Sequence, residues 1–150
     1  MNASIRKYTA NDREDVLHLL RLNTPLYFSP SEEKDLVYYL DNEVEHFYLI
    51  ESGHDLVGCG GFNFSDDLSV GKISWDIFHP DKQGKGFGSL LTKYRIDKLK
   101  SYDSVKTISV RTSQLVYKFY EKFGFELKET VKDYWAEGFD LYRMEFPVSK

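Results

Sequence analysis

Apolar residues recur with a helical period near the start of the chain. After a short strand expected over 4–8, the apolar positions of the segment 11–23 lie three and four residues apart, at Val16, Leu19, Leu20 and Leu22. This spacing places them on one face of a helix. Asn11 or Asp12 can cap its first turn, because a short polar side chain accepts a hydrogen bond from a free backbone N–H group there.

A second helix is predicted over 29–40. Ser29 is a favourable N-cap, and Pro30 suits the first helical position. Glu32 lies three residues after Ser29 and completes a capping box, in which side-chain and backbone groups satisfy each other. These three residues mark the start of the helix.

From residue 46 onward the period changes to that of strands. The segments 46–52 and 56–64 predict a hairpin with Gly-His-Asp as its turn. A third strand is expected over 71–78. Its alternation places Ile73, Trp75 and Ile77 on one face and Ser74, Asp76 and Phe78 on the other.

The last part of the chain alternates helices with strands. The expected elements are a helix over 88–100, a strand over 105–110, a helix over 114–123 ended by Gly124, a strand over 125–131, a loop over 132–138 and a strand over 140–146. Helices that alternate with strands indicate an α/β or α+β class, in which helices cover a central sheet. A chain of 150 residues is expected to form one domain.

Charge narrows the classes of partner. The net charge is -4, with 41% hydrophobic and 16% aromatic residues. A negative chain argues against nucleic acid as the main partner, because affinity for nucleic acid rests on the neutralisation of phosphates. A small or cationic substrate fits this charge better.

The sequence also indicates a compartment. The N-terminal segment lacks the apolar run of a signal peptide, and no apolar stretch is long enough to span a bilayer, so no membrane partner is expected. Cys59 is the single cysteine and cannot form an internal disulfide, which favours the reducing cytoplasm. The four histidines are scattered without ligand spacing, so no metal is expected.

One segment departs from ordinary helix chemistry. The sequence HPDKQGKGFGSLL, residues 79–91, carries three glycines where a helix is expected to begin. Glycine inside a helix costs about 1 kcal/mol relative to alanine, so these glycines need a reason. Backbone N–H groups at a helix N-terminus bind anions, phosphate above all, and glycine lets the backbone come close to them. Lys82 and Lys85 add positive charge to the same loop.

Two common phosphate loops do not fit this segment. A Walker A loop requires G-x-x-x-x-G-K-[ST], but glycine follows Lys85 and the upstream glycine is missing. A Rossmann fingerprint requires G-x-G-x-x-G, and GKGFG places its last glycine one residue too early. A flexible loop with glycine caps is the alternative without a ligand.

The pattern Gln83-x-x-Gly86-x-Gly88 resembles the acyl-CoA pyrophosphate loop of the GNAT superfamily of N-acetyltransferases. A second GNAT-like signature lies in QLVYKFYEKFGFEL, residues 114–127, and consists of Phe119, Tyr120, Gly124 and Phe125. The closing segment 133–146 is similar as well, so the resemblance covers most of the chain. It implies a mixed, mostly antiparallel central sheet flanked by about four helices, with splayed middle strands, in a single domain over 1–150.

The resemblance also implies which residues bind acetyl-CoA as the co-substrate. They lie at the end of the strand over 71–78, in the glycine-rich loop and in the second signature: Ile77, Phe78, His79, Gln83, Gly84, Lys85, Gly86, Phe87, Gly88, Ser89, Ser113, Tyr117 and Tyr120. Family members often carry an asparagine against the pantetheine arm at the start of the second signature. Ser113 or Gln114 takes that position here, with Ser113 preferred, and either side chain can donate and accept a hydrogen bond.

Acetyl transfer from a thioester to an amine requires a proton donor for the leaving thiolate. The resemblance gives this role to Tyr120, whose phenol stays protonated at neutral pH. Tyr117, one turn earlier, is the fallback, and a core aromatic without chemistry is the alternative. Asp76 interrupts an apolar strand, so we predict that it acts as a base or as an anchor for the amine. The alternative for Asp76 is an ion pair with a neighbour such as Lys72 or Arg111.

The acceptor pocket is expected between the two leading helices, the hairpin and the loop over 132–138. Asp76 and the aromatic residues Tyr27, Phe28, Tyr134 and Trp135 are its candidate lining, with Tyr38 and Tyr39 as further walls. Aromatic walls beside an acidic residue suit an amine on a partly apolar body. Ordinary packing is the alternative for each of these aromatic residues.

These observations together predict an acetyl-CoA-dependent N-acetyltransferase that transfers an acetyl group to a primary amine by direct attack in a ternary complex. Two alternatives stay open: a non-catalytic acyl-CoA sensor or regulatory module, and an enzyme whose acceptor is a protein N-terminus or a lysine. The expected partners are acetyl-CoA and a small amine or a peptide, and a homodimer stays open.

Overall fold

The computed structural model describes residues 2–148 of the chain. Within these residues, seven strands form one sheet in the order β1-β2-β3-β4-β5-β7-β6. The strands are β1 (Ala3–Lys7), β2 (His46–Ser52), β3 (Asp55–Phe64), β4 (Val70–Phe78), β5 (Thr107–Thr112), β6 (Glu126–Ala136) and β7 (Phe139–Pro147). The α-helices are α1 (Arg13–Leu22), α2 (Glu33–Asn42), α3 (Phe87–Lys100) and α4 (Tyr117–Glu121).

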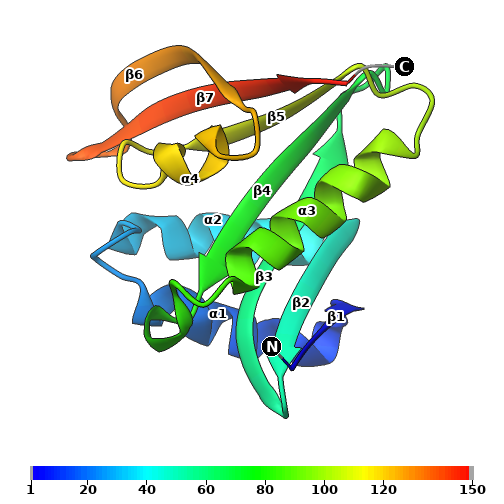
Figure 1. Ribbon diagram of the computed structural model, residues 1–150. Helices are drawn as coiled ribbons and strands as arrows, with labels where there is room; N and C mark the ends of the chain where they lie inside the picture. The colour runs from blue at the N-terminus through cyan, green and yellow to red at the C-terminus, as the bar shows by residue number, and fades with distance from the viewer. Residues whose placement is uncertain (1, 149–150) are drawn as a thin grey trace.

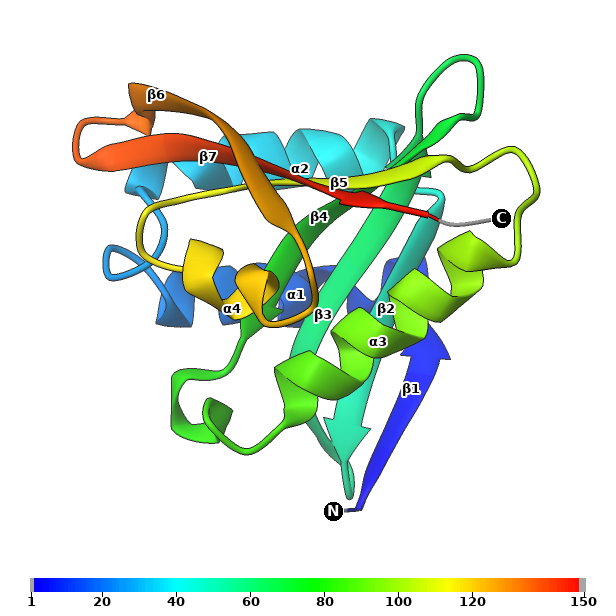
Figure 2. The same ribbon diagram turned by 45° about the horizontal axis from the view of Figure 1, so that its top comes forward.

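The sheet is mixed and mostly antiparallel. Every neighbouring pair of strands runs antiparallel except β4 and β5, which run parallel. Helices α1 and α2 cover one face of the sheet, and α3 covers the other (Figures 1 and 2). The structure thereby confirms the fold class that the sequence predicted.

Two apolar cores lie on the two faces of the sheet. Under α1 and α2, residues such as Leu20 and Leu36 pack against Phe47 of β2. On the opposite face, Leu91 and Leu99 of α3 pack in a larger cluster that reaches β5 and the α4 region. Because a strand directs alternate side chains to opposite faces, β2, β3 and β4 each contribute to both cores, whereas β5 contributes only to the core under α3.

The two parallel strands separate partway along their length. Pairing between β4 and β5 runs only from Val70–Thr107 to Ile73–Val110. Beyond Ile73, β4 continues to Phe78 without β5 beside it. The expected splay of the middle strands is therefore confirmed, and it opens a gap at the centre of the sheet.

A β-bulge in β4 overturns the predicted alternation of this strand. Register shifts between β3 and β4 opposite Gly60, and Trp75 has a φ of 57°. The bulge adds a residue to one face, so Trp75 and Ile77 contact the core under α1 and α2, whereas Ile73 packs in the α3 core. The prediction that these three residues share one face is wrong, because a bulge shifts every following side chain by one position.

The predicted capping residues are confirmed before α2 but not before α1. Ser29 caps a 3₁₀ turn that leads into α2, and Glu32 accepts a hydrogen bond from the Ser29 N–H group at 2.8 Å, as expected. Before α1, Thr9 is the N-cap of a similar turn, and the Asp12 carboxylate accepts from the Thr9 N–H group at 2.9 Å. Asp12 therefore acts from the third position of a capping box, and neither Asn11 nor Asp12 caps α1 with its side chain.

Two predicted boundaries near the C-terminal end are wrong. The segment 132–138, expected as a loop, mostly belongs to β6, which runs to Ala136 and turns directly into β7. Pairing with β7 extends the strand there. The helix predicted over 114–123 is shorter, because α4 spans only Tyr117–Glu121 and its first residues form a turn.

Candidate active site

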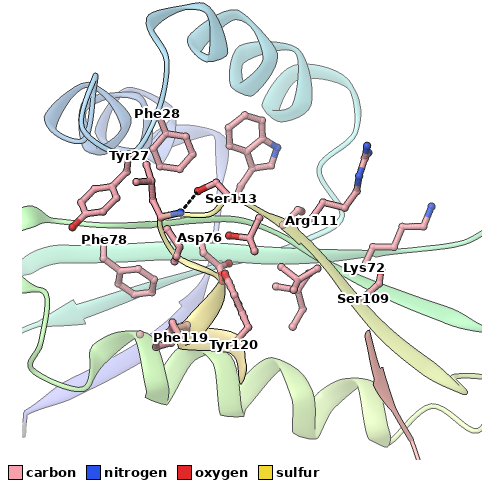
Figure 3. Close-up of a pocket in the computed structure, with 18 of the residues that line it drawn as sticks. Tyr27, Phe28, Lys72, Asp76, Phe78, Ser109, Arg111, Ser113, Phe119 and Tyr120 are labelled. Carbon is pink, nitrogen blue, oxygen red and sulfur yellow. Dashed lines mark hydrogen bonds between the residues drawn. The ribbon is translucent and has the colours of Figure 1, made fainter. Parts of the chain in front are cut away.

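The gap between β4 and β5 contains a cavity of about 1560 Å³. It extends from the glycine-rich loop before α3 to the region between α2 and the β6–β7 hairpin. Figure 3 shows Phe78, Phe119 and Tyr120 on one side of β4, with Tyr27 and Phe28 near the α1–α2 connection. The cavity therefore spans the point where the two strands separate.

The glycine-rich loop presents free backbone donors to this cavity. Gly84 and Gly86 have φ angles of 77° and 90°, in the left-handed region that favours glycine. Within the described residues, no hydrogen bond is formed by the backbone N–H groups of residues 84–89. Gly84, Gly86, Gly88 and Ser89 all line the cavity. Free N–H groups at the N-terminus of α3 suit an anion such as a pyrophosphate.

Gln83 is tied to the protein by a residue that the sequence did not single out. Its amide Nε2 donates to Asn23 Oδ1 and to the Phe78 carbonyl, both at 3.3 Å. Asn23 is 2% exposed and donates from Nδ2 to the same Phe78 carbonyl at 3.0 Å. Asn23 and Gln83 therefore fasten the end of β4 and the start of the loop to α1.

Asp76 lies at the centre of a buried network. The fully buried Arg95 of α3 binds both carboxylate oxygens, with Nη2 at 2.9 Å from Oδ2. The Tyr120 hydroxyl donates to Oδ2 as well. The partner of Asp76 is thus neither Lys72 nor Arg111, which were the candidates from the sequence.

The sequence did carry a signal for Arg95. This arginine lies between Leu91 and Leu99 at four-residue spacing, in the middle of the apolar stripe of α3. A charged residue on a buried helix face needs a partner of opposite charge.

Glycines in β3 provide the space for the ion pair. A Cβ atom at Gly60 would lie 2.5 Å from Asp76 Oδ1 and 2.7 Å from Arg95 Nη1. At Gly61, the backbone carbonyl accepts a hydrogen bond from Arg95 Nη1 at 3.1 Å. The GCGG segment of β3 therefore leaves room for a charged pair that is buried between the sheet and α3.

Tyr120 is almost fully buried, with 3% of its surface exposed, yet it lines the cavity. Burial raises the pKa of Tyr120 well above the ordinary value of a phenol, and the Asp76 carboxylate raises this pKa further. Its ring also packs against Phe119 and Phe125. The hydroxyl is thus a protonated phenol at neutral pH.

The two candidates for the pantetheine position differ in their surroundings. Ser113 lines the cavity, and its Oγ accepts from the Leu115 N–H group at 3.2 Å (Figure 3). Gln114 instead binds the hairpin, donating to the Gly138 carbonyl at 2.7 Å and accepting from the Asp140 N–H group at 2.9 Å.

Tyr117, the fallback acid, does not line the cavity. It packs on Tyr142, with ring centroids 4.7 Å apart.

The predicted cofactor residues divide into two groups. Phe78, Gln83, Gly84, Gly86, Gly88, Ser89, Ser113 and Tyr120 line the cavity. Ile77 and Phe87 are buried in the two cores, and the side chain of Lys85 lies outside the cavity lining. The Nδ1 atom of His79 accepts from the Asp81 N–H group at 3.1 Å. At Ile77, Lys85 and Phe87, a ligand in the cavity would therefore meet the backbone rather than the side chain.

Most of the aromatic residues predicted to surround the acceptor lie along the cavity. Tyr27, Phe28, Tyr39 and Trp135 line the cavity, together with Trp75, which the bulge turns toward Phe28. The rings of Phe28 and Trp75 are stacked with centroids 6.5 Å apart. Tyr38 and Tyr134 are 60% and 46% exposed and do not line it.

Three of the four histidines come together in space. His18, His54 and His79 line a small depression of about 220 Å³ with Asp15 and Asp55. Among residues 2–148, however, no group of three histidine, cysteine or acidic side chains could hold a metal ion.

No helix within residues 2–148 is long and apolar enough to cross a membrane.

Comparison with known proteins gives consistent findings. A family model described as "Acetyltransferase (GNAT) family" matches residues 14–125. The amino-acid acetyltransferase of Neisseria meningitidis is 26% identical over 136 residues, which cover 83% of this chain and 30% of that protein. The chain spans about a third of the length of the curated relatives it matches.

Solved structures resemble the whole fold. The structure of Ard1 from Thermoplasma volcanium has a TM-score of 0.83 at 16% identity and covers 100% of both chains. N-acetylglutamate synthase from Neisseria gonorrhoeae, complexed with coenzyme A and L-arginine, has a TM-score of 0.76 at 20% identity. That alignment covers 99% of this chain and 34% of the synthase.

Proposed function

Because the chain belongs to the acetyltransferase (GNAT) family, we propose that it transfers the acetyl group of acetyl-CoA to a primary amine by direct attack in a ternary complex. The observation that carries this proposal is the cavity at the splayed strands, which adjoins a loop of free N–H donors at one end. A structural neighbour complexed with coenzyme A supports acetyl-CoA as the donor.

In this proposal, the loop over 84–89 binds the pyrophosphate of acetyl-CoA through backbone N–H groups. Lys82, at the mouth of the cavity, adds a positive charge. The pantetheine arm then follows the gap between the strands, along the backbone of β4 near Phe78 and past Ser113. An N–H group of β4 there polarises the thioester carbonyl, as backbone donors do when charge develops on an acyl oxygen.

We assign the proton donor role to Tyr120. The amine attacks the thioester carbon, the new C–N bond forms and the C–S bond breaks. The Tyr120 hydroxyl gives its proton to the sulfur, and the amine gives a proton to the phenol oxygen in the same step. Because the pKa of this phenol is raised, a lasting tyrosinate beside Asp76 would be costly, and the exchange of protons avoids it.

Asp76 acts in this scheme on the proton donor rather than on the substrate. Its carboxylate already binds donors from Arg95 and Tyr120. A hydroxyl hydrogen rotates about its C–O bond, so the Tyr120 proton can turn from Asp76 to the sulfur while the ring stays in place. Asp76 is therefore a positioning residue, and direct proton transfer from the amine to Asp76 is the alternative that its replacement tests.

The proposal is tested by mixing the purified protein with acetyl-CoA and a panel of primary amines, and by measuring release of the CoA thiol. Mass spectrometry of a metabolite extract treated in the same way identifies the acetylated amine. Intersecting lines in a two-substrate kinetic analysis would support a ternary complex, whereas parallel lines would indicate a covalent intermediate and contradict direct attack.

Two outcomes would replace this proposal. Tight binding of acetyl-CoA without thiol release for any amine or peptide would indicate an acyl-CoA sensor. Turnover with peptides or proteins but with no small amine would place the acceptor at a protein N-terminus or a lysine.

A further inference from the structure

Two cationic side chains extend from neighbouring strands into the acceptor half of the cavity. Lys72 of β4 lies opposite Ser109 of β5, and Arg111 follows Ser109 by two residues, so all three side chains share one face of the sheet. Each of them lines the cavity. Figure 3 shows Lys72 and Arg111 directed to the same side, away from Tyr120.

Arg111 differs from the other arginines of the chain. All six lie within residues 2–148. Five of them form ion pairs with carboxylates: Arg6, Arg13, Arg21, Arg95 and Arg143. Arg111 forms none with the described residues, although it has five N–H donors in a planar fork.

Aromatic side chains of β6 hold Arg111 in place instead. Its Cζ atom lies 5.0 Å from the ring centroid of Tyr134 and 5.7 Å from that of Trp135. Nη2 also donates to the Tyr134 hydroxyl, and Trp135 is fixed by a hydrogen bond from Nε1 to the Thr112 carbonyl at 3.1 Å. These contacts position the guanidinium group, and none of them comes from a carboxylate that would neutralise its charge.

The carboxylates on the nearby cavity walls have other partners. Glu129 and Glu145 both bind Arg143, the former at 3.0 Å. Glu45 accepts a hydrogen bond from the Asn63 amide at 3.1 Å.

Lys72 also forms no ion pair with the residues that the structure describes. Glu43, which lines the cavity as well, is the C-cap residue of α2 and forms no ion pair with Lys72 or Arg111. Two positive charges therefore remain without a neutralising carboxylate on this face.

We propose that the acceptor amine carries an oxyanion, a carboxylate or a phosphate, which Arg111 binds through its fork and Lys72 binds through its ammonium group. This inference rests on the proposed function. A guanidinium fork matches the geometry of both oxyanions, and charge-assisted hydrogen bonds are among the strongest in proteins. Because Lys72 and Arg111 are directed away from Tyr120 (Figure 3), the bound anion would lie at the end of the acceptor that is remote from the reacting amine.

The inference changes the expected chemistry of the acceptor. The net charge of the chain favours a cationic partner, but the one acidic side chain at the centre of the site, Asp76, is occupied by Arg95 and Tyr120. On the face formed by β4 and β5, Lys72 and Arg111 keep their charges without an ion pair among the described residues, whereas Glu43 and Glu45, which also form none there, lie between the end of α2 and β2. The local charge, rather than the net charge, decides which group the acceptor carries.

The test compares acceptors that differ only in the anion. Glycine and glycine peptides of two and three residues are each paired with the C-terminal amide, and aminoethyl phosphate is paired with ethanolamine. We expect kcat/KM to be about 10- to 100-fold higher for the anionic member of at least one pair. The pair with the larger ratio distinguishes a carboxylate from a phosphate, and the peptide series gives the spacing from amine to anion.

Variants assign this preference to the two side chains. In Arg111→Gln and Lys72→Met, the anionic acceptor should lose about 10-fold or more in kcat/KM, while its neutral partner changes by less than about 2-fold. Arg111→Lys should retain part of the preference. Lys128→Met removes an equal charge from β6 outside the cavity lining and should behave like the wild type. Equal use of both members of every pair, or an unchanged preference in both variants, would overturn the inference.

A binding measurement separates this inference from the proposed function. Calorimetry of the protein saturated with CoA measures binding of the same acceptors without turnover. Tighter binding of the anionic member, lost in Arg111→Gln, would support the anion site even if no amine were acetylated. Equal binding of both members would overturn the inference even if acetyl transfer were observed.

Discussion

Asp76 lies where β4 leaves β5, and its carboxylate joins side chains from two other elements. Arg95 comes from α3 and Tyr120 from α4, and both contacts are buried. Removing an ion from water costs several kcal/mol, which a partner of opposite charge offsets only when the geometry is good. The network therefore fixes Tyr120 relative to the bulge in β4.

The Tyr120→Phe substitution tests the proton donor. The ring and its packing stay, but the transferable proton is lost, so we expect kcat to fall by about 10²–10⁴-fold. Acetyl-CoA affinity should change little, because one hydrogen bond contributes about 0.5–1.5 kcal/mol. Stopped-flow and steady-state kinetics measure the first effect and calorimetry the second. A variant with nearly full turnover would remove Tyr120 from the mechanism and leave a water molecule as the donor, because Tyr117 does not line the cavity.

Replacement of Asp76 separates positioning from stability. Asp76→Asn leaves the buried Arg95 charge without its partner, so we expect the free energy of unfolding to fall by about 3–5 kcal/mol. The double variant Asp76→Leu/Arg95→Met removes both charges and should recover most of this stability in urea titrations. Its kcat should stay low, because Tyr120 has lost the group that orients its hydroxyl.

Wild-type kcat in that double variant would show that the pair serves stability alone. A raised KM for the amine in Asp76→Asn, with kcat unchanged, would instead indicate that Asp76 anchors the amine.

Two elements shape the site through irregular backbone. The bulge at Trp75 turns Asp76 toward α3 and Trp75 toward Phe28 on the opposite face. The left-handed residues Gly84 and Gly86 turn the chain into α3 and leave the N–H groups of 84–89 without partners among the described residues. Both features adjoin the cavity, because Trp75, Gly84 and Gly86 line it.

The Gly86→Ala substitution tests the loop at the level of the element. A left-handed alanine costs about 1–2 kcal/mol, and its Cβ shifts backbone donors that the pyrophosphate requires, so acetyl-CoA affinity should fall at least about 10-fold. Gly53→Ala is the matched control, because Gly53 has a φ of 64°, open space around it and a position in the β2–β3 turn. It should lose similar stability without losing affinity. Equal affinities of both variants, measured by calorimetry, would contradict the loop assignment.

At the scale of the whole molecule, one buried thiol and two buried phenols with raised pKa values are expected to lower the free energy of unfolding as the pH becomes alkaline. Burial raises the pKa of Cys59, Tyr39 and Tyr120. The folded protein therefore keeps these protons at a pH where the unfolded chain releases them. Their contribution is complete below the ordinary pKa of each group and is lost as pH rises above it.

We expect the free energy of unfolding to decline from about pH 9 upward, by up to about 1.4 kcal/mol per pH unit for each group. Urea titrations between pH 8 and 11 measure this slope. Cys59→Ala and Tyr39→Phe should each make the decline shallower, whereas Tyr38→Phe, at an exposed position on α2, should leave it unchanged. Identical slopes in all of these proteins would show that other groups cause the decline.

The sequence by itself determined the elements, their order and the fold class. Helical spacing, the Ser29 capping box and the glycine pattern before α3 are local features, and local features fix where elements begin and which backbone angles they need. The predicted ends of elements were wrong where contacts with another part of the chain determine them. The strand β6 extends through the expected loop because β7 lies beside it, and α4 is shorter than the apolar pattern suggested.

Only the tertiary structure decided how the site is charged. Asp76 and Arg95 are 19 residues apart and meet between the sheet and α3. The bulge in β4 directs Asp76 toward α3, and Arg95 lies on the buried face of that helix. The same packing pairs five arginines with carboxylates, whereas Arg111, near Lys72, forms no ion pair with any residue that the structure describes. Pairing of charges depends on distances in space, which the sequence sets only through strand register, bulges and helix packing. The sequence therefore predicted the kind of site, whereas the partners of its charged residues could be identified only from the tertiary structure.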